Sequence, residues 1–592
     1  MLQYNLKWVW IILLSAFCFL LAEDWETYYE KSNCKKTPSY DETIDYCRRL
    51  AKASEWVKYA SFGKSPQGRD LPLLIVDKDG NFTPQKVRSS GKIVVLIQAG
   101  IHPGEIDGKD AGLMLIRDMV INKKLSNLLE RVTLLFIPIF NVDGHERSGP
   151  YNRINQNGPE EMGWRVTAQN LNLNRDFLKA DTPEMQAWLP LFNKWLPDLL
   201  VDCHVTDGAD YQYVVTYGME IYANVAKPLR QFSIKVMEPF LNKRMDKDGF
   251  PMSSYVMFRD WNDIKSGLRS GAAGPRYSTG YGVVQNRIFY LIETHMLKDY
   301  NIRVTATFRL LIHLMQLANN YAGEIKNINM QADQLTATSL QEKYLPLRMR
   351  YSPKDSIFID FLGVEYEKVP SKISGTDWVI YHPEKPKTYR MPYFYKVFPT
   401  DSALVPYAYL IPQEWKLQID RLKLHGVKVH YLAKDTTLHV SSYRFKNAKW
   451  RQTPYEGHHR VGFDLETVCE ERQYPAGTAV ILLNQRTNRV IVHLLEPKAP
   501  DSFVYWGYWD TIFERKEYAE YYVLEKLARE MLAKDPALKA EFEYKLANDS
   551  AFAANPRQRL YFFYTRSPYW DEKKDLYPVG KLLQPVKLPL SD

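Results

Sequence analysis

The segment that most clearly indicates the fold is Ile93-Val-Val-Leu-Ile-Gln-Ala-Gly-Ile-His102-Pro-Gly-Glu105. Its apolar half, Ile93–Ala99, has the length of a strand and predicts a buried β-strand. The spacing of apolar residues in Gly108–Val120 predicts a helix soon afterwards. A polar loop that leaves a strand and enters a helix is where open α/β sheets place their ligand sites. We therefore expect a functional site around His102 and Glu105.

The same alternation of strand-like and helix-like segments continues outward from this stretch. The helix-like segments are Pro183–Leu196 and Val304–Ala322, and the strand-like runs are Leu71–Val76, Val132–Phe140, Leu199–Val201 and Ile288–Ile292. Such alternation predicts an α/β fold, in which helices pack against a sheet.

The length of the chain predicts more than one domain. Its 592 residues exceed the size at which a single hydrophobic core keeps growing. A polar stretch rich in Asn and Gln, Lys326–Thr338, interrupts the pattern and indicates a boundary. Strand-like and helix-like runs follow it, among them Tyr407–Ile411 and Gln413–Leu424. We predict a first domain over residues 23–325 and a second mixed α/β module of unknown role over residues 339–592.

The composition is that of a globular protein, with 45% hydrophobic, 14% aromatic and 25% charged residues, and it excludes a largely disordered chain. The net charge of +9 is spread along the chain without a block of Lys and Arg. No nucleic-acid-binding motif accompanies this charge. We interpret it as a solvated basic surface and predict no nucleic-acid partner.

The N-terminus has the outline of a secretory signal. Lys7 precedes the apolar run Trp8–Leu21, which ends at Ala22 before two acidic residues. About fifteen apolar residues are fewer than the roughly 20 that a membrane-spanning helix needs, which favours cleavage near Ala22 over an uncleaved anchor. We predict a signal peptide over residues 1–22 and a secreted or periplasmic mature chain without a stable membrane span.

The cysteines that remain after this signal are too few for a disulfide scaffold; they are Cys34, Cys47, Cys203 and Cys469. Cys34 and Cys47 are close enough in sequence to bridge in an oxidising compartment, and two free thiols are the alternative. Cys203 follows apolar residues of a predicted strand, so we expect a packed thiol rather than a nucleophile.

Two histidines and one glutamate form a candidate metal site. An imidazole and a carboxylate three residues apart, at His102 and Glu105, can both reach one zinc ion if Pro103 and Gly104 make a tight turn. His204 ends another apolar run and supplies a third ligand. Two histidines and one glutamate leave one position of tetrahedral zinc open for a reacting water molecule. We therefore predict one Zn²⁺ per chain.

From about Thr37 to Tyr321 the chain resembles the zinc carboxypeptidase family in the content and the order of its motifs. These motifs are His102 to Glu105, Arg165 in Gly163-Trp-Arg165, Asn174-Arg175 in Asn172-Leu-Asn-Arg175-Asp-Phe177, His204, and Glu293 in Leu291-Ile-Glu293-Thr-His295. The resemblance implies a mixed sheet flanked by helices, and it implies a role for each of these residues.

Glu293 would activate the attacking water as general base, and Arg165 would stabilise the charge that develops on the scissile carbonyl. Asn174 and Arg175 would bind the terminal carboxylate of the substrate, for which the planar guanidinium is suited. The family also uses a tyrosine near the substrate, and Tyr277 and Tyr281 are both candidates.

Two positions depart from the digestive members of the family. Gly104 stands where those enzymes carry an arginine that contacts the substrate. Asn172 stands where a carboxylate commonly accepts a hydrogen bond from a zinc-binding histidine. Neither departure removes a metal ligand, but both argue against transferring a substrate preference.

The predicted function is zinc-dependent hydrolysis of peptide bonds by metal-activated water, removing C-terminal residues from peptides with a free C-terminus. The nearest alternative is a zinc amidohydrolase that acts on acylated amino acids or cell-wall peptides. A second alternative is a non-catalytic peptide-binding protein, against which the intact Glu293 argues. The residues predict no oligomeric state.

Overall fold

The structure is a computed structural model, and it describes residues 24–260, 263–339 and 343–591. The predicted signal peptide over residues 1–22 lies outside the described residues. The chain divides into two compact units. The first contains the residues up to Val405 together with Asp420–Lys428 and Leu483–Ser502, and the second contains Pro406–Ile419, Val429–Leu482 and the residues from Phe503 onward.

The first unit is built on an eight-stranded sheet in the order β1-β2-β4-β3-β5-β10-β6-β7. These strands are β1 (Val57–Lys64), β2 (Asp70–Val76), β3 (Ile93–Gln98), β4 (Val132–Ile137), β5 (Leu199–Thr206), β6 (Val215–Gly218), β7 (Met252–Ser254) and β10 (Ile288–His295). The central strands β4, β3, β5 and β10 are mutually parallel, whereas β1, β2 and β6 pair antiparallel with strands of this sheet. Parallel strands that are covered on both faces have continuous apolar runs. The central strands could therefore be predicted from the sequence.

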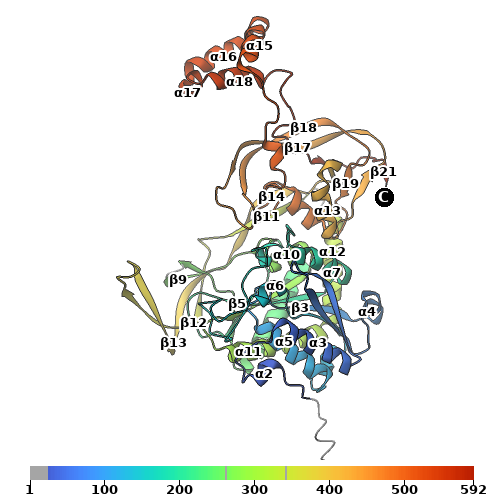
Figure 1. The fold of residues 1–592 in the computed structure, drawn as a ribbon, viewed down its shortest axis with the longest axis vertical. Helices are drawn as coiled ribbons and strands as arrows, with labels where there is room; N and C mark the ends of the chain where they lie inside the picture. The colour runs from blue at the N-terminus through green and yellow to red at the C-terminus, as the bar shows by residue number, and fades with distance from the viewer. Residues whose placement is uncertain (1–23, 261–262, 340–342, 592) are drawn as a thin grey trace, which may run out of the picture. The chain divides into compact units, whose positions relative to one another are not determined.

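Helices cover both faces of this sheet. Figure 1 shows α3 (Tyr40–Ala53), α5 (Asp107–Val120) and α11 (Tyr300–Asn320) on one side and α7 (Pro183–Trp195) and α10 (Ser278–Val284) on the other. The predicted fold class, an α/β fold with a mixed sheet flanked by helices, is confirmed.

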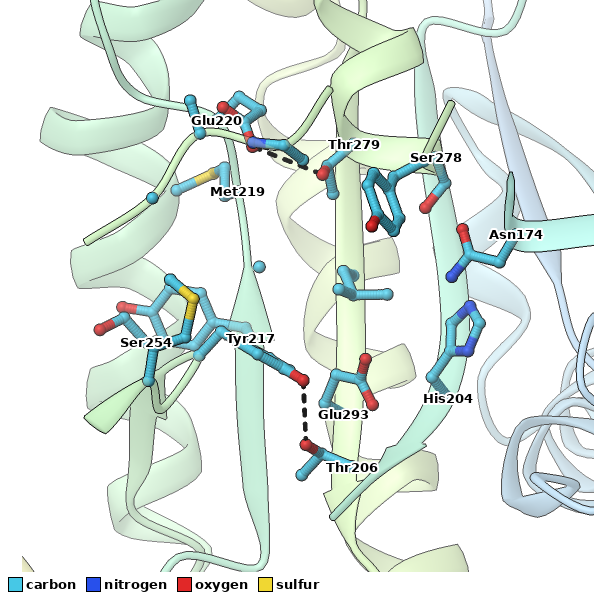
Figure 2. A pocket seen from close by; sticks show the side chains of 18 of the residues that line it. Asn174, His204, Thr206, Tyr217, Met219, Glu220, Ser254, Ser278, Thr279 and Glu293 are labelled. Carbon is cyan, nitrogen blue, oxygen red and sulfur yellow. Dashed lines mark hydrogen bonds between the residues drawn. The ribbon is translucent and has the colours of Figure 1, made fainter. Parts of the chain in front are cut away.

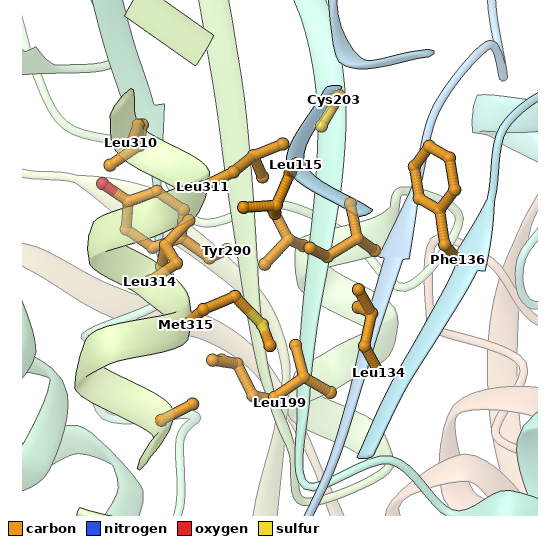
Figure 3. Packing of buried hydrophobic residues seen from close by; sticks show 14 of the residues in the cluster. Leu115, Leu134, Phe136, Leu199, Cys203, Tyr290, Leu310, Leu311, Leu314 and Met315 are labelled. Carbon is orange, nitrogen blue, oxygen red and sulfur yellow. The ribbon is translucent and has the colours of Figure 1, made fainter. Parts of the chain in front are cut away.

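The main core lies between the sheet and the pair α5 and α11. Leu115 of α5, Met315 of α11 and Leu199 of β5 converge there and are all almost completely buried (Figure 3). Burial of one such side chain contributes about 1.5–3 kcal/mol to stability. Gly112 lets α5 approach the sheet closely, because a Cβ atom at this position would lie 2.3 Å from the ring of Phe136.

The opposite face of the sheet is covered by aromatic side chains. Trp188 of α7 stacks on Phe192 and meets Phe177 edge to face. Its indole Nε1 donates a hydrogen bond to Oε1 of Gln98 at 3.0 Å. Since Gln98 ends β3, this bond anchors the strand from which the loop carrying His102 departs.

The carboxyl ends of the parallel strands meet at one edge of the sheet. Gln98 of β3 pairs with Asp202 of β5, and His204 of β5 pairs with Glu293 of β10. His204 on β5, Glu293 on β10 and the loop that follows β3 are therefore brought to the same edge, as expected for an open α/β sheet.

The polar stretch Lys326–Thr338, where the sequence indicated a boundary, is helical and lies within α12 (Ala322–Ser339). Ile325, Ile328 and Ala332 are buried along one side of this helix. These residues are three and four positions apart, so they form a narrow apolar stripe along an otherwise polar helix.

The remainder of the first unit contains two smaller sheets. One has the order β12-β13-β9-β8 and the other pairs β11 with β14. Their strands are β8 (Phe258–Asp260), β9 (Asp263–Arg269), β11 (Tyr344–Tyr351), β12 (Ile357–Pro370), β13 (Asp377–Phe394) and β14 (Val397–Leu404). Further helices are α8 (Lys227–Phe232), α9 (Glu238–Lys247) and α14 (Asn488–Leu495).

The second unit is also mixed α and β. Its sheet has the order β18-β17-β20-β15-β19-β16-β21, with β15 (Ala408–Ile411), β16 (His430–Leu432), β17 (Thr436–Trp450), β18 (Val461–Tyr474), β19 (Ala479–Leu482), β20 (Gly580–Leu582) and β21 (Leu590–Ser591). Four helices follow one another near the C-terminus: α15 (Tyr521–Lys534), α16 (Pro536–Asn548), α17 (Ser550–Ala553) and α18 (Pro556–Tyr564). Asp535 ends α15 and caps α16, accepting a hydrogen bond from the amide of Ala537 at 2.9 Å.

The cysteines of the described residues are free thiols, so Cys34 and Cys47 are not bridged. Cys203 is 2% exposed, and burial raises the pKa of its thiol well above the usual value. It is the packed, unreactive thiol that the sequence predicted. Across the described ranges, none of the helices is both long enough and apolar enough to cross a membrane.

Candidate active site

Three predicted ligands converge at the carboxyl edge of the sheet. His102 and Glu105 lie in the loop between β3 and α5, and His204 lies on β5. Oε2 of Glu105 is 3.1 Å from Nδ1 of His102 and 2.9 Å from Nδ1 of His204. All three side chains are buried, and one ligand atom from each lies within 4.8 Å of the others.

The donor atoms of this cluster fit a metal ion, with Nδ1 of His204 bonded to Oε2 of Glu105 at 2.9 Å. Nδ1 of His102 is buried and makes no hydrogen bond within the described residues. Burial lowers the pKa of His102 to about 4, which keeps its imidazole neutral at pH 7. Burial alone would raise the pKa of Glu105, but the imidazole of His102 and the guanidinium of Arg153 hold it well below its usual range. Two imidazole nitrogens and one ionised carboxylate around a single point match the donor set of a catalytic zinc site.

Each histidine is oriented by a polar group on the far side of its ring. Oδ1 of Asn172 accepts a hydrogen bond from Nε2 of His102 at 3.0 Å, so the amide that replaces the family's carboxylate does make this contact. Oδ2 of Asp202 accepts one from Nε2 of His204 at 3.0 Å. Both contacts direct Nδ1 of the ring toward Glu105. Such partners set the ring orientation and tune metal affinity.

Asp202 belongs to a longer chain of hydrogen bonds that the sequence did not reveal. Its Oδ1 accepts from Nε2 of Gln98 at 3.1 Å, and Oε1 of Gln98 accepts from the indole of Trp188. His204 is thereby connected to the aromatic core on the opposite face of the sheet. One local signal was present: Asp202 and His204 are two residues apart on a strand and so face the same side.

Glu293 lies near the end of β10, directly beside His204 in the sheet register. Its carboxylate and the His204 ring are adjacent in Figure 2, at the wall of a cavity that both residues line. Burial raises the pKa of Glu293 to about 8. A carboxylate with a raised pKa beside the ligand cluster is suited to accept a proton and then donate it.

Two arginines bind Oε1 of Glu105. Nη1 of Arg165 and Nη1 of Arg153 each lie 2.9 Å from it. Arg165 was predicted at the site, but Arg153 was not. Gly104 makes room for Arg153, because a Cβ atom on residue 104 would lie 2.2 Å from its Cδ. The departure at Gly104 is thus matched by an arginine that enters the same space from another part of the chain.

The predicted substrate-binding residues separate into two groups. Asn174, Arg175 and Tyr277 line the cavity, and the Arg175 guanidinium lies 4.5 Å from the centre of the Tyr277 ring. Tyr281 lies instead in the core with no exposed surface. Its hydroxyl is bonded to Nδ1 of His425 at 2.8 Å, so it does not reach the cavity.

The cavity has a volume of about 500 Å³, within the usual range for small-ligand sites. One end holds the His102, Glu105 and His204 cluster together with Glu293. The walls beyond it include Met219 and Glu220 (Figure 2). The carboxylate of Glu293, a candidate metal centre and the guanidinium of Arg175 thus line one cavity.

Comparisons with known proteins find a matching family model and similar carboxypeptidases. Residues 43–191 match the family model described as zinc carboxypeptidase. This segment includes His102, Glu105, Arg165 and Arg175, while His204 and Glu293 lie beyond it. The chain is 24% identical over 491 residues to carboxypeptidase 2 of Trichophyton rubrum, covering 79% of this chain and 84% of that protein. It is 24% identical over 492 residues to carboxypeptidase 2 of Trichophyton tonsurans, with the same coverage.

Solved structures of carboxypeptidases are also similar to this chain. A putative carboxypeptidase A from Shewanella denitrificans has 18% identity and a TM-score of 0.37, covering 48% of this chain and 69% of that chain. Carboxypeptidase A from Helicoverpa armigera has 18% identity and a TM-score of 0.36, covering 50% of this chain and 75% of that chain. The family match and the fungal relatives confirm the resemblance to zinc carboxypeptidases and the prediction of a peptide-hydrolysing enzyme of that type.

Proposed function

We propose that this chain removes residues from the C-terminus of peptides by zinc-dependent hydrolysis, with His102, Glu105 and His204 as the metal ligands. The observation that carries the proposal is the convergence of both Nδ1 atoms on the Glu105 carboxylate, with Glu293 beside them in one cavity. When bound, zinc would polarise the scissile carbonyl and lower the pKa of a water molecule.

Glu293 is the proposed proton carrier. It takes a proton from the attacking water and passes it to the leaving amine, which requires a carboxylate whose pKa lies near the working pH. The burial that raises the pKa of Glu293 to about 8 favours the protonated form needed for the second step.

Arg165 and Arg175 have separate tasks in the proposal. Arg165 lies at the ligand cluster and is 44% exposed, so its side chain is accessible to a carbonyl oxygen that becomes negatively charged. Arg175 and Asn174 bind the free carboxylate of the substrate, and the Tyr277 ring holds the guanidinium from one face. Oδ1 of Asn174 is buried without a hydrogen-bond partner within the described residues, and so is available to a donor on the substrate.

The decisive experiment combines metal analysis with mass spectrometry of a mixed peptide set, in which every sequence is present with a free C-terminus and with a C-terminal amide. We expect about one zinc ion per chain and stepwise loss of residues from the free-acid peptides alone. Release of an acyl group without loss of C-terminal residues would instead identify an amidohydrolase. Peptide binding without turnover at one equivalent of zinc would identify a non-catalytic protein.

A further inference from the structure

Glu220 is a half-buried residue in the wall of the same cavity, and one oxygen of its carboxylate is buried. It follows β6 by two residues and lies with Met219 and Thr279 in the part of the cavity shown at the top of Figure 2. Its Oε1 accepts a hydrogen bond from the amide of Ala273 at 2.9 Å and one from Oγ1 of Thr279 at 3.5 Å. Its Oε2 is buried and has no hydrogen-bond partner within the described residues.

No cation of the described residues pairs with Glu220. Buried carboxylates are normally paired, because removing a charge from water is costly. Arg269 also lines the cavity, but its guanidinium lies over the ring of Tyr351, 5.4 Å from the ring centre. Burial raises the pKa of Glu220 to about 7, as expected for a carboxylate that lacks a counter-charge. The cavity thus contains an acceptor atom for which the described part of the chain supplies no donor.

The position of Glu220 relative to Glu293 follows from the strand register. Gly218 of β6 pairs with Leu291, and Thr216 pairs with Glu293, so β6 runs away from Glu293 toward its end at Gly218. Figure 2 shows Glu220 beyond that end, in the part of the cavity away from Glu293. The strand segment from Thr216 to Gly218 rises roughly 7 Å at about 3.3 Å per residue, and Glu220 follows two residues beyond the end of the strand. A long side chain on the substrate residue, together with the two glutamate side chains, spans this interval.

The wall between the two glutamates suits a methylene stem. Leu291 and Met219 line the cavity there and are apolar. Lysine and arginine combine an apolar stem with a cationic head, so their stems can pack on such a wall while the head reaches an acceptor. A neutral side chain of the same length would fill the space but leave the carboxylate unpaired.

We propose that Glu220 selects peptides whose C-terminal residue is lysine or arginine, by pairing its free carboxylate oxygen with the cationic head of that residue. The proposal rests on the carboxypeptidase function proposed above, and it names the substrate class for that same cavity. Glu220 acts on the substrate side chain and takes no part in bond cleavage.

The test is a panel of N-blocked dipeptides that differ only in the C-terminal residue: lysine, arginine, norleucine, methionine and phenylalanine. For the zinc-loaded enzyme we expect kcat/KM for lysine and arginine to exceed that for norleucine at least tenfold. Glu220→Gln, which keeps the shape of the side chain, should reduce this ratio at least tenfold. A thermal melt of the variant shows whether it is folded.

Glu238→Gln is the matched control. Glu238 also lines the cavity, but its carboxylate already accepts a hydrogen bond from the Tyr217 hydroxyl at 2.6 Å. The Glu238→Gln substitution should change the ratio of kcat/KM for lysine to kcat/KM for norleucine less than threefold. The proposal is overturned if the wild-type enzyme prefers norleucine, methionine or phenylalanine, or if Glu220→Gln leaves the ratio unchanged.

Binding separates this proposal from the proposed function. If no dipeptide of the panel loses its C-terminal residue, the carboxypeptidase function fails, and calorimetry with free arginine and free norvaline still tests the pocket. Tighter binding of arginine that disappears in Glu220→Gln supports the role of Glu220. Equal binding of the two amino acids by the wild-type protein contradicts it.

Discussion

Adding one methyl group at Gly104 should weaken zinc binding by displacing Arg153. A Cβ atom there would lie 2.2 Å from Cδ and 3.1 Å from Cγ of Arg153, and 3.0 Å from the carbonyl oxygen of Gly163. The arginine stem is more easily moved than the backbone. In Gly104→Ala we therefore expect the guanidinium to leave Oε1 of Glu105, which it now approaches to 2.9 Å.

The size of the effect follows from the contacts that are lost. A hydrogen bond to a charged group contributes about 1.5–3 kcal/mol, and each 1.4 kcal/mol is a factor of ten in affinity. Arg165 also holds Oε1 of Glu105 at 2.9 Å and would retain part of the orientation of the carboxylate. We therefore expect the lower end of the range, about a tenfold loss of zinc affinity.

The assay is competition for zinc with a chelator, measured for Gly104→Ala, Arg153→Ala and the double variant. If the methyl acts through Arg153, it should cost little once Arg153 is absent, so the two effects will not add. Full additivity would refute this reasoning and point to the Gly163 carbonyl instead. Gly323→Ala is the control, since the nearest atom to its Cβ would be a guanidinium nitrogen of Arg131 at 3.4 Å.

The remaining predictions concern three carboxylates. Glu293→Gln should keep one equivalent of zinc but lower kcat by a factor of about 10²–10⁴, the usual contribution of a general base; unchanged turnover would remove Glu293 from the mechanism. Asp202→Asn should lower zinc affinity by about 10- to 100-fold in the chelator assay, since Asp202 accepts from Nε2 of His204; an unaltered affinity would show that this bond does not tune the site. Glu184→Gln should stabilise the protein at pH 8 by up to about 3 kcal/mol in denaturant unfolding and by little at pH 4.5. Burial raises the pKa of Glu184 to about 7 and neither of its oxygens has a hydrogen-bond partner within the described residues, so wild-type stability is lost as the pH rises from 4.5 to 7; an equal gain at both pH values would contradict this.

Several parts of the fold could be predicted because their signal is local. Ile93–Ala99 and Ile288–Ile292 are continuous apolar runs, and they became β3 and β10 because both faces of the central sheet are covered. The helix α12 was missed because only a narrow stripe, including Ile325 and Ile328, is buried in it. The polar composition of Lys326–Thr338 is typical of a linker, although the buried residues of α12 recur at helical spacing.

The choice between Tyr277 and Tyr281 illustrates a limit of local reasoning. Both residues lie in one short motif, and the sequence treats them alike. Tyr277 precedes the first turn of α10 with an extended backbone and faces the cavity, whereas Tyr281 lies inside the helix and points into the core toward His425. The direction of a side chain depends on how its helix is rotated against the sheet, and only packing sets that rotation.

The sequence alone was sufficient to predict the α/β fold, the central strands and the candidate ligands His102, Glu105 and His204, because apolar runs and motif spacing are local properties of the chain. The tertiary structure decided which charged groups meet there. Arg153 enters the space beside Gly104, and Glu220 faces the cavity without a counter-charge. These contacts join segments that are distant in the chain, and their partners are selected by strand register and close packing, which no local pattern of residues encodes.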